Sequence, residues 1–275
     1  MAEIIAICNQ KGGVGKTTTA INVAACLAAA EKNTLLIDMD PQGNASTGLG
    51  INKYEVEASI YDVLMRGVDI RTVIQNLYLS HLSIIPSNTE LVGAELELVD
   101  LVSRETKFKE ALAGIQDSYD YIIVDCPPSL GLLTLNALTA AQSVLIPVQC
   151  EYYAMEGMAD LQRTIGLVQK GLNTSLKVRG IVLTMFDARN NLSRQVTEEV
   201  RQFFGDVVYE SVVPRNVRLS EAPSYGKPII LYDVNSKGAA SYLALAQEIM
   251  GIKAENNNNV NELGGSPDAA TTSTR

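Results

Sequence analysis

The 275-residue sequence lacks any apolar run of the length that a membrane span requires, and it lacks a Cys-x-x-Cys pair. The first absence excludes a transmembrane helix. The opening apolar stretch is too short for a signal peptide and has no basic segment before it. The four cysteines stand far apart in the sequence, so a reduced, cytoplasmic protein is expected.

Positive charge is also scarce. Lys and Arg number 22 against 31 Asp and Glu, so the net charge is −9. Such a chain is a poor match for nucleic acid, because affinity for DNA comes mostly from neutralisation of phosphates by Lys and Arg. A local basic patch can overcome the average, so any DNA binding is expected to be weak and sensitive to salt. The only histidine, His81, is expected in a loop or at a strand edge, without a functional role.

What the sequence does contain is a regular alternation of short apolar runs and helical stretches, typical of a parallel sheet with helices on both faces. The expected strands are 4–8, 34–39, 82–86, 121–125, 143–149, 178–185 and 207–213. The expected helices are one that ends near 30, then 60–65, 90–102, 107–115, 130–141, 155–170, 192–204 and 236–250. Ser59 is the expected N-cap of the second helix. We therefore predict a doubly wound, mostly parallel α/β fold.

Residues 1–250 contain no internal repeat and no break in this pattern, so one domain is expected. Hydrophobic residues make up 47% of the chain, enough for a substantial core. From Gly251 the composition changes to Asn, Gly, Ser, Thr and Ala. Such a segment cannot bury a core, and residues 251–275 are therefore predicted to form a disordered polar tail.

A phosphate-binding loop follows the first expected strand. Its sequence is Lys11-Gly12-Gly13-Val14-Gly15-Lys16-Thr17-Thr18. The glycines let backbone N–H groups turn inward as an anion nest, and the following helix adds its N-terminal dipole. Lys16 can reach the β- and γ-phosphates, and the Thr17 hydroxyl can ligate Mg²⁺. The loop departs from the usual P-loop pattern, since Gln10 occupies the first glycine position and a second lysine, Lys11, follows it.

Three aspartates are expected at the carboxyl ends of strands, where the groups that act on a bound triphosphate belong. Asp125 ends an apolar strand and is expected to hold Mg²⁺ through a water. Asp38 and Asp40 lie two positions apart at the end of the expected strand 34–39, so they point to the same side. Asp40 precedes Pro41 at the crest of the loop, and we assign it to orienting the attacking water. Asp38 is assigned a supporting role near the metal.

The loop form K-G-G-x-G-K-[ST]-T resembles the deviant Walker A motif of the ParA/MinD family of ATPases. The block L-L-I-D-x-D-P-Q-G-N at 35–44 resembles the Walker A′ motif of the same family, in which the second aspartate is catalytic. The resemblance covers residues 3–250 and is strongest to the short chromosomal ParA/Soj type. It implies a weak, partner-stimulated ATPase that uses ATP and Mg²⁺. It further implies that Lys11 crosses a dimer interface to the nucleotide of the second subunit.

The same resemblance implies two more sets of residues. Loops that frame adenine in ParA-like ATPases correspond to Met185, Pro214, Arg215 and Asn216. Candidate contacts to DNA phosphates are Arg189, Arg194, Arg218 and Lys227. The implied function is a switch for chromosome or plasmid segregation. An ATP-bound homodimer binds DNA non-specifically, associates with the nucleoid, and is released when a ParB-like centromere-binding protein stimulates hydrolysis.

Sister branches of the family remain as alternatives. A MinD-like protein that positions itself on membranes would end in a basic amphipathic helix, whereas this chain ends in a polar, Asn-rich stretch. No membrane partner is therefore expected. A metallocluster relative would need a second cysteine to act with Cys126, and none has a convincing position. A metabolic P-loop ATPase would not need Lys11 in this form. The chain begins almost at its first strand, so no operator-reading domain is expected.

Overall fold

The computed structural model describes residues 1–152 and 156–252. In this part of the chain, eight strands form one sheet in the order β3-β4-β2-β5-β1-β6-β7-β8. Their bounds are β1 Glu3–Ile7, β2 Thr34–Asp38, β3 Gln75–Asn76, β4 Leu82–Ile85, β5 Tyr121–Asp125, β6 Ser143–Gln149, β7 Lys177–Phe186 and β8 Val208–Pro214. All neighbours pair in parallel except β3, which runs antiparallel to β4. The predicted mostly parallel α/β fold is confirmed.

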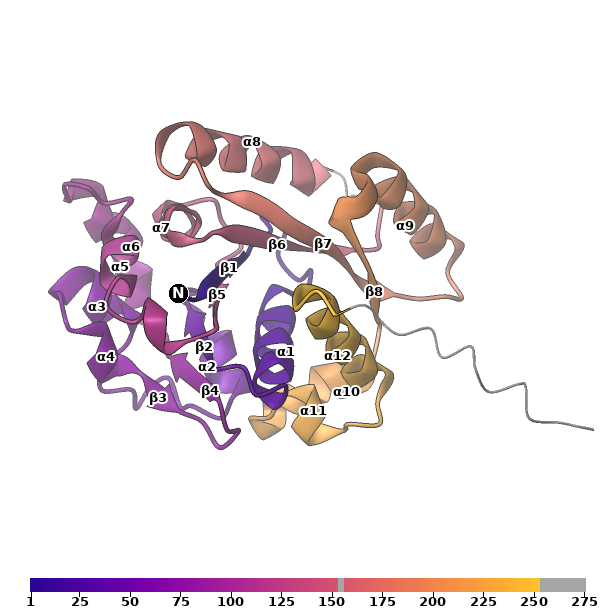
Figure 1. The fold of residues 1–275 in the computed structure, drawn as a ribbon, viewed down its shortest axis with the longest axis horizontal. Coiled ribbons are helices and arrows are strands. Elements are labelled where there is room, and N and C mark those ends of the chain that lie inside the picture. The colour runs from indigo at the N-terminus through magenta and orange to yellow at the C-terminus, as the bar shows by residue number, and fades with distance from the viewer. Residues whose placement is uncertain (153–155, 253–275) are drawn as a thin grey trace, which may run out of the picture.

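Helices cover both faces of the sheet (Figure 1). Their bounds are α1 Lys16–Ala29, α2 Asn44–Gly48, α3 Ile60–Arg66, α4 Ile70–Val73, α5 Leu91–Glu97, α6 Lys107–Leu112, α7 Leu132–Ala140, α8 Glu156–Gly171, α9 Asn191–Phe204, α10 Val217–Glu221, α11 Ile229–Tyr232 and α12 Lys237–Ile249. Figure 1 shows α7, α8 and α9 on one side of the central strands, and α1 and α12 on the other.

The alternation of side chains along each strand divides the core in two. On β1, Ile4 and Ala6 belong to the cluster under α3 and α5 to α9, while Ile5 and Ile7 belong to the cluster under α1 and α12. All four are fully buried. Because both faces of β1 are covered, its sequence is continuously apolar rather than alternating. This explains why the strands were recognisable as short apolar runs.

Most expected elements lie within about two residues of their predicted bounds. Ser59 caps α3 in a reciprocal capping box with Asp62, and Ser236 caps α12 by accepting the N–H of Ala239. Two expected helices are shorter. The stretch predicted at 90–102 is α5, followed by a single 3-10 turn at Leu98–Asp100 and then by turns, and the helix predicted at 107–115 ends at Leu112. The first residue of the helix predicted at 155–170, and the tail from 253, lie outside the described residues.

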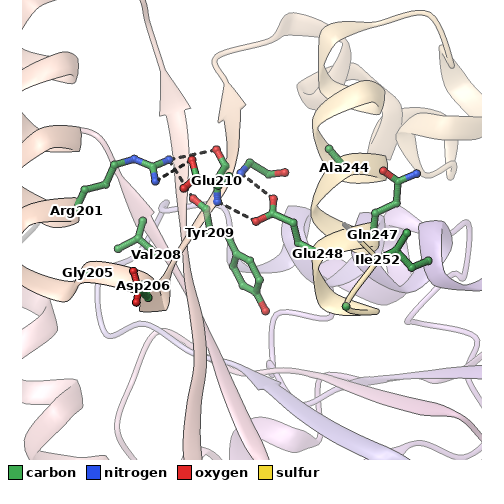
Figure 2. Close-up of a pocket in the computed structure, with 12 residues that line it drawn as sticks. Arg201, Gly205, Asp206, Val208, Tyr209, Glu210, Ala244, Gln247, Glu248 and Ile252 are labelled. Atoms are coloured by element: carbon green, nitrogen blue, oxygen red, sulfur yellow. Dashed lines mark hydrogen bonds and ion pairs between the residues drawn. The ribbon is translucent and has the colours of Figure 1, made fainter. Parts of the chain in front are cut away.

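The free edge of β8 is covered by side chains. A cavity of about 1010 Å³ lies there between α9 and α12 (Figure 2). Glu248 accepts the N–H groups of Glu210 and Ser211, at 2.9 and 2.8 Å, while Arg201 donates to the carbonyls of Tyr209 and Glu210. These contacts occupy backbone groups that an edge strand otherwise offers to another chain. We therefore interpret this cavity as part of a protected edge.

The strand ends bring the predicted site together. The carboxyl ends of the parallel strands meet at one edge of the sheet, as is usual for ligand sites in such folds. Asp125 is in register with Ile7 of β1 and with Asp38 of β2, so the phosphate-binding loop and two of the aspartates converge. Among the described residues, no helix is long and apolar enough to cross a membrane.

Candidate nucleotide-binding site

The loop between β1 and α1 has the backbone of an anion nest. Gly13 and Gly15 have φ angles of +75° and +88°, in the left-handed region that favours glycine. Gly15 is the N-cap of α1 and has no side chain to offer, so the first N–H groups of the helix point to the space above it. Lys11 to Thr18 therefore form one continuous cradle at the helix N-terminus, where an anion is stabilised.

Two polar side chains hold this loop in place through contacts that the sequence did not predict. Asn9 donates to the carbonyl of Pro147 at 2.7 Å and accepts the N–H of Lys11 at 3.0 Å. Thr184 at the end of β7 donates to the carbonyl of Val14 at 2.8 Å. Both side chains are buried. They fix the loop to β6 and β7, which lie more than 130 positions away in sequence.

Lys16 is buried in the cradle, with 6% of its surface exposed. Its Nζ donates to the carbonyl of Lys11 at 3.3 Å. Burial lowers the pKa of Lys16, and the carboxylates of Asp125 and Asp40 oppose this change. The lysine is thus held by the loop that an anion would occupy, and it lies close enough to both aspartates to feel their charge.

Asp125 is fully buried, and no hydrogen bond of normal geometry reaches either of its carboxylate oxygens. Burial raises the pKa of Asp125 well above its ordinary value, the charge of Asp38 raises it further, and the nearby Thr17 hydroxyl opposes part of the rise. A buried carboxylate without a partner is costly. A hard cation would satisfy both oxygens, and Thr17 adds an oxygen donor of the type that Mg²⁺ prefers. The residues present therefore fit a magnesium ion.

Asp38 and Asp40 differ in their partners. Asp38 is completely buried and accepts the N–H and the Oγ–H of Ser46, at 2.8 and 2.7 Å, and the N–H of Asp40 at 3.2 Å. Burial raises the pKa of Asp38 to about 6, against the opposing effect of the hydrogen bonds from Ser46. Asp40 is 6% exposed and accepts the N–H of Gln42 through one oxygen at 2.9 Å. Asp38 thus organises the loop that carries Asp40.

Lys11, in contrast to Lys16, lies near the surface. Its ammonium is 3.8 Å from Glu151, whose other carboxylate oxygen is 3.6 Å from the guanidinium of Arg215. The side chains of Lys11 and Arg215 are 33% and 62% exposed. Exposed ion pairs of this kind contribute little to stability and exchange readily. Lys11 is therefore available for another anion.

The residues predicted to frame adenine line one cavity. This cavity, of about 530 Å³, opens beside Gly15 and Thr18 and is lined by Thr184, Met185, Val213, Pro214, Arg215, Asn216, Val217, Leu219, Ser220, Pro223 and Tyr242. The N–H of Arg215 bonds to the carbonyl of Phe186 at 2.9 Å, which joins the two loops. Met185 has a φ of +52°, a strained conformation of the kind found at functional sites.

Four of the lining residues were predicted, namely Met185, Pro214, Arg215 and Asn216. The sequence reading missed Tyr242, a fully buried residue of α12 whose hydroxyl lies 3.1 Å from the hydroxyl of Thr19 on α1. A tyrosine within an amphipathic helix is indistinguishable from an ordinary core residue in a single sequence.

The four candidate DNA contacts lie around the ends of β7 and β8. Arg189 and Arg194 stand in and after the loop that follows β7, and Arg218 and Lys227 follow β8. All four are exposed. Two already have acidic partners within the chain: Arg189 pairs with Asp187 at 3.1 Å, and Arg218 pairs with Glu221 and Asp233 at 3.0 and 3.4 Å. DNA contact by these residues stays a prediction.

Comparison with known proteins gives a consistent result. A family model described as an AAA domain matches residues 2–178. The sporulation initiation inhibitor protein Soj of Bacillus subtilis is 59% identical over 249 residues, which cover 90% of this chain and 98% of that protein. The chromosome partitioning protein ParA of Myxococcus xanthus is 59% identical over 250 residues, which cover 91% of this chain and 88% of that protein.

Solved structures share the fold. Cobyrinic acid a,c-diamide synthase from Mycobacterium smegmatis with bound ADP and magnesium superposes with a TM-score of 0.80 at 36% identity, over 91% of this chain and 94% of that one. The cell division ATPase MinD of Pyrococcus furiosus superposes with a TM-score of 0.74 at 25% identity, over 92% and 100%. The predicted ATPase activity is confirmed by these relatives, as is a site for nucleotide and Mg²⁺. The chain belongs to the ParA/Soj family of partitioning ATPases.

Proposed function

We propose that this chain is an ATP-driven switch for chromosome or plasmid segregation. It binds ATP and Mg²⁺, forms a homodimer around two nucleotides, and then binds DNA non-specifically. A ParB-like centromere-binding partner stimulates hydrolysis and releases it. The observation that carries the proposal is the buried carboxylate of Asp125 beside Lys16 and Thr17. A cation would pair with this carboxylate, and a phosphate anion would pair with Lys16.

The phosphate cradle supplies binding and positioning. Backbone N–H groups of Gly12 to Thr18 hold the phosphate oxygens, and Lys16 exchanges its bond to the Lys11 carbonyl for the β- and γ-phosphates. Thr17 and Asp125 would hold Mg²⁺, with Asp125 acting through a water. When bound, this ion neutralises charge that develops on the phosphate oxygens. Asp38 is engaged by Ser46, so it supports the site rather than ligating the ion.

Hydrolysis needs a water held in line with the γ-phosphate. We assign this task to Asp40. One of its oxygens is fixed by the N–H of Gln42, which orients the carboxylate and leaves the second oxygen for the water. Orientation of the water, rather than removal of its proton, is the main requirement in phosphoryl transfer.

Lys11 links nucleotide to assembly. Its pairing with Glu151 keeps the ammonium near the surface of its own subunit, and a second subunit's triphosphate offers a stronger anion. Dimerisation also explains how a chain with a net charge of −9 would bind DNA. Two weak basic surfaces joined in one particle bind DNA with a large gain in effective affinity. The ATP-bound form is then the nucleoid-associated one.

The two relatives at 59% identity, Soj and ParA, support partitioning over the metabolic activity of the M. smegmatis synthase, which is 36% identical. The decisive experiment is binding to non-specific duplex DNA at low salt with ATP, with ADP and without nucleotide. Binding with ATP alone that fades as salt rises is expected. Equal binding in all three states, or none, would contradict the proposal, and binding to anionic liposomes instead would favour a MinD-like protein.

A matched pair of variants makes this experiment specific. Arg189→Ala is expected to weaken ATP-dependent DNA binding at least fivefold. Arg71→Ala is the control. Like Arg189, Arg71 pairs with the aspartate two residues before it, and its side chain is 67% exposed. It lies near β3, at the other end of the sheet from β7 and β8. If both variants weaken binding equally, the loss reflects overall charge rather than a contact at Arg189.

A further inference from the structure

A lysine side chain lies over the turn that carries Asp40. This turn runs from Asp40 to Gly43 and is closed by the N–H of Gly43, which donates to the carbonyl of Asp40 at 2.9 Å. The carbonyl of Gln42 accepts the Nζ of Lys53 at 2.5 Å. The peptide between Gln42 and Gly43 is therefore held at both ends, through its N–H by Asp40 and through its carbonyl by Lys53.

The aliphatic part of Lys53 also packs on this turn. Gly43 is buried and has a φ of +62°. A Cβ built on Gly43 would lie 3.0 Å from Cδ and 3.6 Å from Cβ of Lys53. The lysine stem therefore occupies the space beside Gly43 that a larger side chain would need. Lysine stems commonly cover a surface in this way while the ammonium reaches a polar partner, so Lys53 supplies both packing and a charged donor.

The segment that carries Lys53 is itself anchored. The N–H of Ile51 donates to the carbonyl of Ser46 at 3.0 Å. Gly50 lies against Gly226, so closely that a Cβ on Gly226 would be 2.7 Å from the Cα of Gly50. Both glycines have a positive φ, at +86° and +62°, which permits this approach of two backbones. Lys53 is therefore presented from a held backbone.

The same contacts connect the two aspartates of the strand end. Ser46, whose carbonyl holds the segment, is also the residue whose N–H and hydroxyl bind Asp38. At the other end, Lys53 binds the carbonyl of Gln42, and the N–H of Gln42 holds one oxygen of Asp40 at 2.9 Å. Both aspartates are thus tied to one segment of the chain, and Lys53 makes the connection to Asp40.

We propose that Lys53 is a positioning residue for ATP hydrolysis. Its ammonium fixes the turn between Asp40 and Gly43, so that Asp40 keeps its second oxygen directed at the attacking water. A hydrogen bond from an ammonium is stronger than one between neutral groups. A small displacement of a group that orients a reactant lowers the rate steeply. This inference rests on the water-orienting role proposed for Asp40 and adds the residue that holds this carboxylate in place.

The test uses the full-length chain without DNA and without a partner protein. Lys53→Met keeps an unbranched stem over Gly43 and removes the ammonium, whereas Lys53→Arg keeps a charged donor. Lys109→Met, at an exposed lysine of α6, is the control for the loss of one positive charge. We measure kcat and KM for ATP, and the dissociation constant of a fluorescent ATP analogue in the presence of Mg²⁺.

Lys53→Met is expected to lower kcat about tenfold and to leave KM and the dissociation constant of the analogue within about twofold. Lys53→Arg should recover most of the lost rate, and Lys109→Met should behave like the unmodified chain. A normal kcat in Lys53→Met would overturn the inference. A loss of rate that follows weakened nucleotide binding, or that arginine does not recover, would overturn it as well.

A double-variant cycle separates this inference from the role of Asp40. Asp40→Asn is expected to be slow, and adding Lys53→Met should change its residual rate by less than about twofold, because Lys53 acts through Asp40. A further loss of about tenfold would overturn the inference, since Lys53 would then act independently. If Asp40→Asn is slow and Lys53→Met is normal, only the role of Lys53 fails. If Asp40→Asn hydrolyses ATP at the normal rate, the role proposed for Asp40 fails too.

Discussion

Replacement of Asp125 by asparagine is expected to stabilise the nucleotide-free protein while destroying its response to magnesium. The carboxylate is fully buried, its oxygens lack partners, and burial and Asp38 both raise its pKa. Attraction to Lys16 opposes this rise in pKa less than the Thr17 hydroxyl does. Leaving a buried charge uncompensated costs about 3–5 kcal/mol, and an amide with incomplete hydrogen bonding costs about 1–3 kcal/mol. The net gain in the free energy of unfolding at pH 7.5 is therefore about 2 kcal/mol.

The sign of the pH dependence follows from the raised pKa. A carboxyl group that is harder to ionise in the folded state destabilises the fold once it would be ionised in the unfolded chain, so the penalty grows as pH rises above 3.8, its ordinary value. The advantage of Asp125→Asn should therefore shrink as pH falls toward 3.8. For a domain of this size, about 2 kcal/mol corresponds to an increase in melting temperature of roughly 4–8 °C at pH 7.5.

The assay is thermal unfolding with and without ATP and Mg²⁺ between pH 5 and 8. The unmodified chain should gain stability from the ligands, by about 2.7 kcal/mol when they are present at 100 times their dissociation constant. Asp125→Asn should gain much less, and Asp100→Asn, which removes an exposed carboxylate, should match the unmodified chain. An Asp125→Asn variant that melts lower than the unmodified chain at pH 7.5, or that keeps the full magnesium response, would refute the reasoning.

Three further substitutions test other parts of the site. Lys16→Ala should abolish nucleotide binding in calorimetry, and residual affinity within tenfold of the unmodified chain would remove Lys16 from its assigned role. Thr184→Val removes the 2.8 Å bond to the Val14 carbonyl and should weaken nucleotide binding about fivefold, consistent with about 1 kcal/mol; unchanged affinity would mean that the loop is held by other contacts. Gly131→Ala should lower the free energy of unfolding by about 1–3 kcal/mol through collision with Glu95, and adding Glu95→Ala should restore it; no restoration would place the strain elsewhere.

Features that depend on contiguous residues were predictable from the sequence. Strands buried on both faces, such as β1 and β5, are apolar runs, and the caps at Ser59 and Ser236 are local hydrogen bonds between neighbours. The phosphate-binding loop is likewise a single segment whose glycines are required by the left-handed backbone at Gly13 and Gly15.

Features that depend on distant residues were not. Asn9 reaches Pro147, and Thr184 reaches Val14, across more than 130 positions, and no local pattern marks either side chain. The bridge from Lys11 through Glu151 to Arg215 likewise joins three separate loops. For these contacts, strand order decides which loops meet, and strand order does not follow from the apolar runs.

The helix predicted at 90–102 is instructive for another reason. Its apolar residues continue past the end of α5, so the pattern alone suggests a longer helix. In the fold, Val99 and Val102 are exposed rather than packed, so their side chains do not stabilise a longer helix by burial. The roles assigned to Asp40, Asp38 and the DNA-contact residues stay predictions.

The measurement that tests the central claim most directly is the molar mass of the Asp40→Ala variant by light scattering after gel filtration. The variant should bind ATP without hydrolysing it. With ATP and Mg²⁺ its mass should be twice that of the 29.7 kDa chain, and with ADP it should be that of a monomer. Adding Lys11→Ala should return the ATP form to monomer. A monomer with ATP, or a dimer that survives loss of Lys11, would contradict the switch described here.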